Sequence, residues 1–459
     1  MRGWILILAT LAGCPAPAQT PAVPAGRPDV LVIISDDLNC RLGCYGDAMV
    51  RSPNLDRLAA RGRRFERAFC QYPVCNPSRT SFLTGLRPET TRVFGNQTDW
   101  RPLLPGRTTL PAHFRRNGYR TASIGKVFHG DFIDPAAWDE FIPPDESTTR
   151  KPVIDGKSGY WYGRPVPFGE KGLGWGPTDR ADAEEPDGIY ARAAAEILRR
   201  PRDKPLFLAV GFHRPHDPFI SPKKYFDLYD PARITLPATP AGSLAAVPAA
   251  ALKSSLNHLE GFDDTLRKEF IRAYIAGISF MDVQLGVVLD ALRESRREEN
   301  TTVVFWGDHG YQLGEHGGLF GKATLFEETA RVPMIFAGPG VKRAGEAAAG
   351  LAEFVDVYPT LCDLAGLPAP PGLEGASLRP LLADPSAPGK DAAYTMMTRG
   401  GVARSVRTAR WRYTEWGGPG QAELYDHEAD PGENRNLAKD PAQTGTVREM
   451  REVLMRVRR

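Results

Sequence analysis

The sequence has little cysteine, no excess of charge of either sign and no internal repeat. Six cysteines among 459 residues are too few for a disulfide scaffold, and none belongs to a Cys-x-x-Cys pair typical of a zinc ribbon. The 58 Lys and Arg residues are balanced by 55 Asp and Glu residues, which argues against a nucleic-acid-binding domain, since such domains are distinctly basic. A hydrophobic fraction of 42% excludes a disordered chain. A large globular protein remains, most often an enzyme, and its length predicts more than one domain.

The first eighteen residues form a predicted export signal that is not part of the fold. The apolar run from Trp4 to Ala12 is too short to span a bilayer and is typical of a signal peptide. Leu11-Ala12-Gly13-Cys14 resembles the lipobox of bacterial lipoproteins, and Ala16-Pro17-Ala18 resembles an ordinary cleavage site. The position of Cys14 directly after the apolar run favours the lipobox. We therefore predict a signal peptide over residues 1–18, a tether over residues 19–27, and an exported protein. It would be a periplasmic or outer-membrane lipoprotein of a bacterium, touching the membrane only through an N-terminal lipid anchor.

Strands and helices alternate along most of the remaining chain. Apolar runs of the kind found in strands buried on both faces recur between amphipathic segments. The predicted strands cover residues 29–34, 120–124, 205–210 and 302–306, and the predicted helices cover residues 53–60, 109–116, 190–199 and 266–296. No run after the signal is long and apolar enough to predict a membrane helix. The alternation predicts an α/β sandwich with a large, mostly parallel sheet flanked by helices.

Each of the four predicted strands is followed by acidic, lysine or histidine side chains. In open α/β sheets, ligands bind outside the carboxyl ends of the strands. One polar residue at a strand end is ordinarily a cap or a turn residue, but four such ends together favour a functional site. The residues concerned are Asp36 and Asp37, Lys126 and His129, His213 and His216, and Asp308 and His309.

Two long segments interrupt the alternation, and a smaller unit follows it. Residues 130–188 are rich in Gly, Pro and aromatic side chains, which favours an active-site lid, whereas residues 219–263 are rich in Pro and Ala and are more ambiguous. A Pro- and Gly-rich passage at residues 368–388 predicts a boundary between a catalytic domain, residues 28–388, and a small α+β subdomain, residues 389–459. In that subdomain, short alternating pieces at residues 402–408, 411–416 and 423–426 predict an antiparallel sheet, closed by a helix over residues 446–457.

The segment that begins at Cys75 carries the most specific signal. Pro77 fits the first turn of a helix, and a helix start offers free N–H groups and a positive dipole end to an anion. Arg79 lies one turn into that helix and can reach back to an anion or to residue 75. A lone cysteine beside a helix start is ordinarily structural, so the complete string decides the interpretation.

The string from Cys75 to Gly85 resembles the signature of type I sulfatases, Cys-x-Pro-x-Arg followed by Leu-Thr-Gly. The resemblance extends from Asp29 to about Leu437 and is similar to the iduronate-2-sulfatase-like branch of bacterial sulfatases. It implies an alkaline-phosphatase-like sandwich with a small C-terminal antiparallel sheet. It also implies that a formylglycine-generating enzyme oxidises Cys75 to formylglycine, whose hydrate is the nucleophile, and that Arg79 stabilises the sulfate charge.

The acidic strand ends are candidate metal ligands. Several carboxylates that converge on one sulfate would repel it unless a cation lay between them, and oxygen ligands suit Ca²⁺, with Mg²⁺ as the alternative. The resemblance implies a divalent cation, usually calcium, at Asp36, Asp37, Asp308 and His309, with residue 75 completing the set. Many relatives have Asn where this chain has His309, and imidazole is an unusual ligand for a hard cation.

The remaining candidate catalytic residues are two lysines and two histidines. The resemblance implies that His129 takes the proton from the second hydroxyl of the hydrate, which expels sulfate and regenerates the aldehyde, and that Lys126 holds a sulfate oxygen. It implies further that His216 and Lys322 contact the sulfate and the leaving oxygen and that one of the two is the general acid. We favour His216 as the acid and Lys322 as an electrostatic clamp, with His213 as the acid if the register of that loop differs.

The segment before Lys322 departs slightly from the family pattern. Glu315 and His316 fit the family string and are interpreted as supports of their loop, not as catalysts. Gly317-Gly318 makes the segment one residue longer than expected before Lys322. The geometry of this loop is therefore a question for the structure.

Together these features predict hydrolysis of a sulfate monoester on a sulfated carbohydrate, with a 2-O-sulfated uronic acid as a candidate substrate. Arg164 and Lys171 in the first long segment are candidate carboxylate contacts or solvated surface residues. Phosphonate or phosphate monoester hydrolysis by the same machinery is the enzymatic alternative. A non-catalytic lipoprotein that binds sulfated glycan is the alternative from another class, and no nucleic-acid partner is expected.

The cysteines have three predicted fates. Cys14 becomes a lipid anchor or is removed, and Cys75 is oxidised. The others could form disulfides in an exported protein, but the sequence does not choose partners for them. These are Cys40, Cys44, Cys70 and Cys362.

Overall fold

The computed structural model describes residues 26–144, 153–154, 157–158, 174–254 and 263–458. The predicted signal peptide, Cys14 and most of the tether lie outside the described residues. So do Arg164 and Lys171 of the first long segment.

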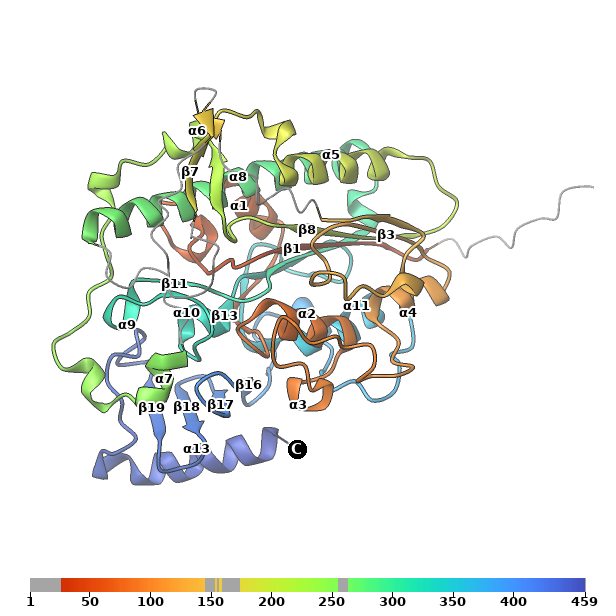
Figure 1. Cartoon of the computed structure of the whole chain (residues 1–459). Coiled ribbons are helices and arrows are strands. Elements are labelled where there is room, and N and C mark those ends of the chain that lie inside the picture. Colours follow the sequence, from red (N-terminus) through yellow and green to blue (C-terminus); the bar gives the residue numbers. More distant parts are fainter. Residues whose placement is uncertain (1–25, 145–152, 155–156, 159–173, 255–262, 459) are drawn as a thin grey trace, which may run out of the picture.

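A nine-stranded sheet forms the centre of the molecule (Figure 1). Its strands run in the order β13 (Arg331–Val332), β2 (Gly62–Phe69), β14 (Met334–Ala337), β10 (Thr301–Gly307), β1 (Asp29–Ser35), β8 (Leu206–Phe212), β3 (Arg120–Gly125) and β4 (Glu140–Ile142), with β15 (Ala347–Glu353) paired to β2. Strand β1 lies between β10 and β8 and is parallel to both, and all seven of its residues are buried. Only β13 and β14 pair antiparallel to their neighbours, so the prediction of a mostly parallel sheet is confirmed.

Helices cover both faces of this sheet. On one face lie α1 (Pro53–Ala60), α5 (Pro186–Arg199) and α8 (Asp264–Glu294), and on the other lie α2 (Cys75–Thr84), α4 (Leu110–Arg116) and α11 (Val357–Leu364) (Figure 1). The side chains of β1 alternate between the two layers: Leu31 and Ile33 pack in the first core, and Val32 and Ile34 in the second. A continuous apolar run is therefore required in β1, because both of its faces are covered.

Helix α8 corrects one expectation. By length and mean hydropathy alone it is long and apolar enough to cross a membrane. Inside the fold, however, 83% of its most apolar window is buried. This is the environment of a core helix, and its apolar residues face α1, α5 and the sheet.

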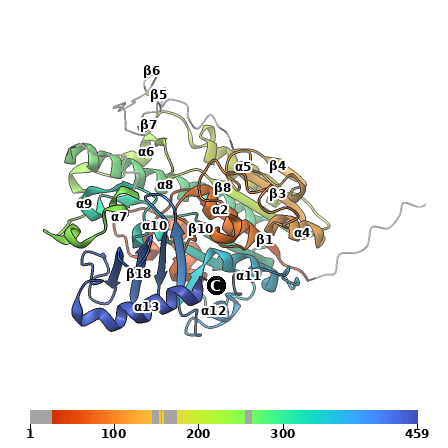
Figure 2. The same cartoon turned by 60° about the horizontal axis from the view of Figure 1, so that its bottom comes forward.

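A second, four-stranded antiparallel sheet forms the C-terminal subdomain (Figure 2). Its strands follow the chain in order: β16 (Ala393–Met397), β17 (Ala403–Arg407), β18 (Trp411–Trp416) and β19 (Ala422–Asp426). Helix α13 (Thr444–Val457) packs on this sheet and buries Met450, Val453 and Leu454. The predicted small antiparallel sheet is confirmed, although its first strand, β16, was not predicted.

The two long segments contain several short elements. The first adds β4 to the edge of the main sheet, and its β7 (Trp175–Thr178) pairs in parallel with β9 (Phe219–Pro222) of the second. The first also contains β5 (Val153–Ile154) and β6 (Lys157–Ser158), and the second contains α6 (Lys223–Phe226) and α7 (Ala249–Ser254). Short elements elsewhere in the chain are α3 (Pro88–Thr91), α9 (Glu315–Gly318), α10 (Glu327–Ala330), α12 (Arg379–Ala383), β11 (Gln312–Leu313) and β12 (Phe320–Gly321). Within the described part of the chain all five cysteines are free thiols, so none of the open disulfide pairings is present there.

Candidate active site

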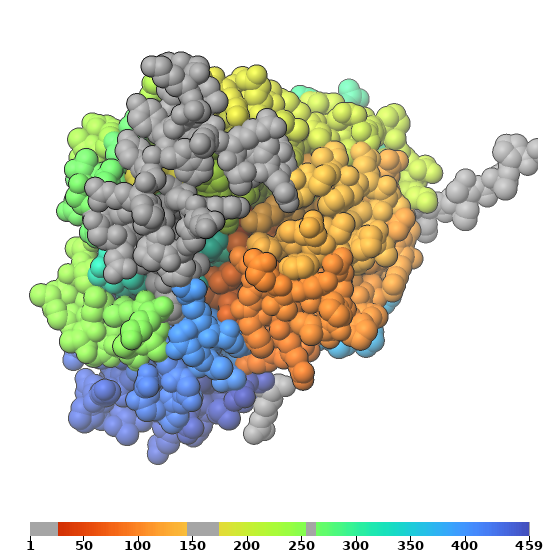
Figure 3. Space-filling model, viewed as in Figure 1, coloured from red at the N-terminus to blue at the C-terminus, as the bar shows by residue number. Residues whose placement is uncertain are grey.

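The carboxyl ends of β1, β3, β8 and β10 meet beside the first turn of α2, as the sequence predicts. They bring into contact side chains as distant in the chain as Asp37 and Lys322, which are 285 positions apart. The surface on the face shown in Figure 3 is hollowed where the orange residues that follow α2 approach the light-blue residues of the C-terminal subdomain. The residues gathered at these strand ends and at the start of α2 are Asp36, Asp37, Cys75, Arg79, Lys126, His129, His216, Asp308, His309 and Lys322.

Asp37 leaves the end of β1 in a left-handed backbone conformation, with a φ of 60°. Two contacts hold it there: its N–H donates to Asp308 Oδ1 at 3.0 Å, and the Tyr274 hydroxyl donates to its carbonyl oxygen at 2.6 Å. Such backbone strain in a non-glycine residue persists only where the surroundings impose it, and it concentrates at functional sites. The turn directs consecutive carboxylates, Asp36 and Asp37, into one buried cluster.

Cys75 is the first residue of α2 and is fully buried. Its Sγ lies 3.3 Å from Lys322 Nζ, 3.4 Å from His309 Nε2 and 3.9 Å from Asp37 Oδ1. Burial opposes ionisation of the thiol, as does the Asp36 carboxylate, but Lys322, Lys126 and His309 outweigh them and lower its pKa well below the usual value. Residue 75 is therefore surrounded by positive charge, the environment of a reactive and not a structural cysteine.

Arg79 holds the carboxylates of the site in place. Its Nε donates to Asp308 at 3.0 Å, its Nη2 to Asp36 at 3.1 Å, and its Nη1 to the carbonyl oxygens of Lys126 and Val127. The guanidinium is 1% exposed, so its donors are committed to the protein. Its predicted contact with sulfate stays a prediction, and the structure adds a positioning role.

The two lysines each pair with one of the two consecutive aspartates. Lys126 Nζ contacts Asp36, and Lys322 Nζ donates to both oxygens of Asp37 at 2.7 and 2.9 Å. Burial lowers the pKa of each lysine, but the carboxylates outweigh it and raise the pKa of both. Gly211 makes room for Lys126: a Cβ at Gly211 would lie 2.1 Å from the Lys126 carbonyl oxygen.

The three histidines take different positions. His216 Nε2 lies 4.0 Å from both Asp36 and Asp37, whereas His213 Nε2 bonds to the Asp217 carbonyl oxygen at 2.8 Å. Burial disfavours the charged form of His216, but Asp217 and Asp37 raise its pKa well above the usual value. His129 lies beside Cys75, and burial lowers its pKa. The geometry thus favours His216 over His213 as a proton donor and keeps His129 neutral.

The acidic residues fit a divalent cation. Ligand atoms of Asp36, Cys75, Asp308 and His309 lie within 4.8 Å of one another, and those of Asp36, Asp37, Cys75 and His216 do likewise. His309 Nδ1 bonds to the Gly310 carbonyl oxygen at 2.9 Å, so this nitrogen carries the proton and Nε2 faces Asp37. Ligating histidines in proteins are fixed in the same way through their other nitrogen. Three of these residues are aspartates, which suits a hard cation such as Ca²⁺, and the His309 imidazole is oriented as a ligand would be.

The loop before Lys322 accommodates its extra residue with backbone turns. His316, Gly317 and Gly318 all have positive φ values, of 51°, 85° and 86°. The His316 ring stacks on Phe326 with a centroid distance of 3.7 Å, and its Nε2 lies 3.2 Å from Glu328. These contacts agree with the predicted supporting role of this residue.

Sequence analysis did not identify Tyr274 or Asp187 as part of this region. Tyr274 reaches Asp37 from the interior of α8, and Asp187 contacts the loop of His213 from the first turn of α5. Neither belongs to a motif, and both bond to backbone atoms. Only the topology of the sheet brings them to the site.

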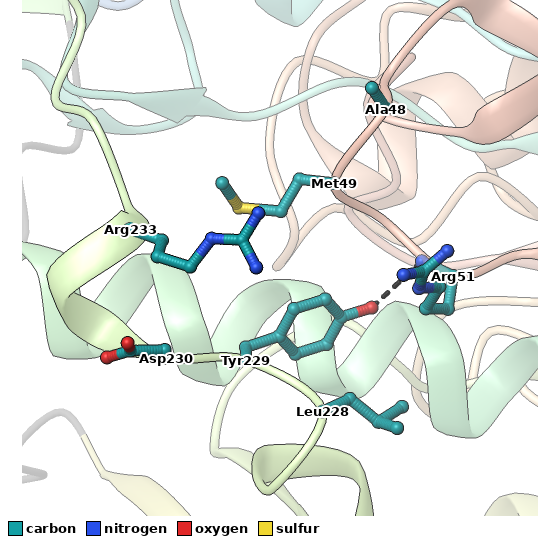
Figure 4. Close-up of a pocket in the computed structure, with 7 residues that line it drawn as sticks. All are labelled: Ala48, Met49, Arg51, Leu228, Tyr229, Asp230 and Arg233. Carbon is teal, nitrogen blue, oxygen red and sulfur yellow. Dashed lines mark hydrogen bonds between the residues drawn. The ribbon is translucent and has the colours of Figure 1, made fainter.

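A separate hollow lies outside the cluster (Figure 4). In it the Tyr229 hydroxyl accepts the N–H of Arg51 at 2.9 Å. The lining residues are Ala48, Met49, Arg51, Leu228, Tyr229, Asp230 and Arg233. None of them is a predicted site residue.

Comparisons with known proteins cover nearly the whole chain. A family model described as Sulfatase matches residues 28–367, and one described as the C-terminal part of N-sulphoglucosamine sulphohydrolase matches residues 314–459. A protein of Formosa agariphila named sulfatase is 35% identical over 435 residues, covering 90% of this chain and 83% of that protein. Iduronate 2-sulfatase of Mus musculus is 32% identical over 523 residues, covering 92% of this chain and 93% of that protein.

The fold also matches solved structures. The phosphonate monoester hydrolase of Agrobacterium radiobacter superimposes with a TM-score of 0.80 at 23% identity, covering 94% of this chain and 95% of that one. At this identity the likeness shows the fold alone. It agrees with the mostly parallel sheet and the C-terminal antiparallel sheet, and the predicted fold class is confirmed.

Proposed function

The chain belongs to the sulfatase family, and from that premise we propose that it removes sulfate from a sulfated carbohydrate, with a 2-O-sulfated uronic acid as the target. The enzyme class itself, a sulfatase, follows from the family. The observation that carries the proposal is the position of Cys75: it begins α2, and it contacts Lys322 and His309 within a buried ring of carboxylates.

Two groups would complete the site. Formylglycine, made from Cys75 by a formylglycine-generating enzyme, supplies a hydrated aldehyde as the nucleophile. A divalent cation, Ca²⁺ in this proposal, supplies positive charge at the sulfate oxygens and would be held by Asp36, Asp37, Asp308, His309 and residue 75. The donors fit both groups, because residue 75 and these ligands share one buried cluster.

The residues of the chain then have separate tasks. Lys126 and Lys322 present ammonium groups where negative charge accumulates as the S–O bond breaks. His216 bonds through Nδ1 to the Asp217 carbonyl oxygen at 2.8 Å, which leaves the Nε2 proton for the leaving alcohol. His129 takes a proton from residue 75: its Nδ1 is buried and has no hydrogen-bond partner among the described residues. The carboxylates and residue 75 are buried, whereas His129 and His216 are partly exposed, on the side from which a substrate would enter.

The choice of a sulfated uronic acid rests on the relatives. The protein named iduronate 2-sulfatase matches 92% of this chain, and the proposal carries that substrate class to the present enzyme. Arg164 and Lys171, which lie outside the described residues, stay candidate contacts to the sugar carboxylate.

Mass spectrometry of the Cys75 peptide, from protein made in its native host, tests the mechanism. We expect the mass of formylglycine at residue 75. An unmodified thiol in active protein from that host would contradict the proposal, whereas protein made without the maturation enzyme is no test.

The fold of the phosphonate monoester hydrolase supports one alternative, hydrolysis of phosphonate or phosphate monoesters. Rates of the matured enzyme on 4-nitrophenyl sulfate and on an aryl phosphonate decide between the two. We expect a higher rate on the sulfate. A strong preference for the phosphonate would overturn the proposal that the natural substrate is a sulfate ester.

We also propose that the protein is exported and anchored through Cys14, on the evidence of the lipobox-like segment. Cell fractionation of the wild type and of Cys14→Ala tests this. We expect the wild type in the membrane fraction and the variant outside it. If the two proteins distribute equally between the fractions, the proposed anchor at Cys14 is wrong.

A further inference from the structure

A buried carboxylate outside the catalytic cluster holds the loop that carries His216. Asp187 lies in the first turn of α5 and is 1% exposed. Its Oδ1 accepts the N–H of His213 at 2.8 Å, and its Oδ2 accepts the N–H of Arg214 at 2.9 Å. Both oxygens are therefore used to fix two consecutive peptide groups directly after β8.

Three further bonds surround this anchor, and two of them reach His216. The Ser35 hydroxyl, at the end of β1, donates to the Arg214 carbonyl oxygen at 2.7 Å. Arg214 Nη1 donates to the carbonyl oxygen of His216 at 3.3 Å, and the His216 N–H donates to that of His213 at 3.0 Å. Asp187 and the strand that presents Asp36 and Asp37 thus both hold the backbone at Arg214, and His216 is bonded to the residues fixed there.

The anchor lies among buried charged groups. Arg214 is 2% exposed, and burial lowers the pKa of its guanidinium although the carboxylates of Asp187 and Glu185 act to raise it. Glu185 in turn accepts the Thr178 hydroxyl at 2.7 Å. None of these groups contacts Cys75 or the metal-ligand carboxylates, so Asp187 reaches the reaction only through the backbone of the loop.

We propose that Asp187 is a positioning residue for the general acid: it fixes the backbone of residues 213 and 214 so that His216 Nε2 faces the leaving oxygen. This inference rests on the proposed function, since it assigns a partner to His216 in sulfate ester hydrolysis. With asparagine in place of the carboxylate, one of the two buried N–H groups meets an amide NH2 group in place of an acceptor, and the loop must move to satisfy it. A displacement of about 1 Å at a catalytic group can cost on the order of 100-fold in rate.

The chain offers a matched control in Asp282, on α8. It is also fully buried and also accepts two consecutive backbone N–H groups, those of Asn54 at 3.0 Å and Leu55 at 2.8 Å. The backbone that it fixes, the start of α1, carries no predicted catalytic residue. Asp187→Asn and Asp282→Asn therefore remove the same chemistry from two places.

The test compares both variants, in the matured full-length enzyme, on 4-nitrophenyl sulfate and phenyl sulfate. Phenol, released from phenyl sulfate, is a poorer leaving group than 4-nitrophenol, so hydrolysis of phenyl sulfate depends more on a proton donor. We expect Asp187→Asn to lower kcat on phenyl sulfate by about 10- to 100-fold, with a smaller loss on 4-nitrophenyl sulfate and KM changed by less than about threefold. Asp282→Asn should leave the ratio of the two kcat values unchanged, whatever its effect on thermal stability.

The outcomes separate the positioning role of Asp187 from the proposed function. If Asp187→Asn behaves like Asp282→Asn, the positioning role is overturned. If the wild type hydrolyses neither sulfate while Cys75 is converted, the proposed function fails instead, before Asp187 is considered. If Asp187→Asn does not fold, Asp187→Glu takes its place, because it keeps the charge and moves the oxygens by one methylene. A decrease in kcat that is equal on the two substrates would then overturn the proposal.

Discussion

At the scale of single residues, Lys322 contacts both Asp37, a proposed metal ligand, and Cys75, the proposed nucleophile. Its Nζ lies 2.7 Å from Asp37 and 3.3 Å from Cys75 Sγ, and its side chain is 6% exposed. Removing such a charge affects both the reaction and the folded state. The two effects respond differently to a bound cation.

We predict that Lys322→Met lowers kcat by about 100- to 1,000-fold, because it removes a fixed donor from the developing negative charge. In chelator the variant should also lose about 3–5 kcal/mol of unfolding free energy, since Asp37 keeps a buried charge with one fewer partner. Added Ca²⁺ should restore part of that loss, because the cation pairs with Asp37. Urea unfolding with EDTA and with Ca²⁺ measures this.

Lys223 provides the control for that comparison. It forms an exposed pair with Asp227 at 2.6 Å, and its side chain is 61% exposed. Lys223→Met should change stability by less than about 1 kcal/mol in either buffer. A loss in Lys322→Met that Ca²⁺ does not reduce would argue against a cation at Asp37.

At the scale of elements, the end of β15 carries a buried ion network that joins the main sheet to the segment before β16. Glu353 contacts Lys390 and accepts from Arg87 at 2.6 and 2.9 Å, and it also accepts the N–H of Tyr394 at 3.0 Å. Burial raises the pKa of Glu353, but Lys390 and Arg87 outweigh burial and lower it below the usual range. When folding lowers the pKa of a group, the unfolding free energy of the protein depends on pH.

The sign of this link is fixed by the direction of the shift. A carboxyl whose pKa is lower in the folded state stabilises the protein above its unfolded pKa of about 4.3 and loses that contribution as the pH falls through the folded value. We predict that Glu353→Gln costs about 3 kcal/mol at pH 7 and that the cost shrinks below about pH 4. Urea unfolding of both proteins between pH 3 and 7 measures it.

Glu294 is the matched control, since its pair with Arg199 is exposed, with a side-chain exposure of 54%. Glu294→Gln should cost less than about 1 kcal/mol at every pH. A cost in Glu353→Gln that does not depend on pH would mean that packing, not charge, explains the effect.

The sequence predicts a strand well where both of its faces are buried and its residues must be apolar, and poorly where charged residues interrupt the apolar pattern. Strand β1 is apolar because helices cover both of its faces, and the sequence predicts it within one residue. Strand β2, with the sequence GRRFERAF, was missed because its charged residues hide the pattern. Arg63 in that strand is fully buried, and its guanidinium donates to the carbonyl oxygens of Lys342 and Glu346. Partners so distant in sequence leave no local signal.

At the scale of the whole molecule, one arginine joins the C-terminal sheet to the catalytic part. Arg412 on β18 is 1% exposed and contacts Glu327, on α10, and Glu433. We predict that Arg412→Gln lowers the unfolding free energy by about 3–5 kcal/mol, because two buried carboxylates each lose one of their partners. Calorimetry should show the C-terminal subdomain unfolding before the rest, with early protease cleavage beyond residue 388.

Arg451 serves as the control, because its pair with Glu415 at 3.0 Å is 49% exposed on the arginine side. Arg451→Gln should leave one transition and change stability by less than about 1 kcal/mol. A single unshifted transition in Arg412→Gln would show that this contact does not couple the two parts.

The candidate site could be predicted from the sequence to the extent that its residues follow strands or belong to the Cys75 string. Asp36, Asp308 and Lys126 were found in this way, and the structure brings them together. Asp187 and Tyr274 could not be found, because they hold backbone atoms 26 and 237 positions away. Their importance exists only once the sheet has formed.

The distance in sequence between Cys75 and the groups that enclose it also determines how long residue 75 stays accessible during synthesis. Lys322 follows Cys75 by 247 residues. At a synthesis rate of about 5–20 residues per second, roughly 12–50 seconds separate the emergence of the two. Throughout that interval the thiol lacks the lysine and the imidazole that later enclose it. Any enzyme that must reach residue 75 therefore has to act on the nascent or unfolded chain, and a chain that completes its sheet first has lost the opportunity.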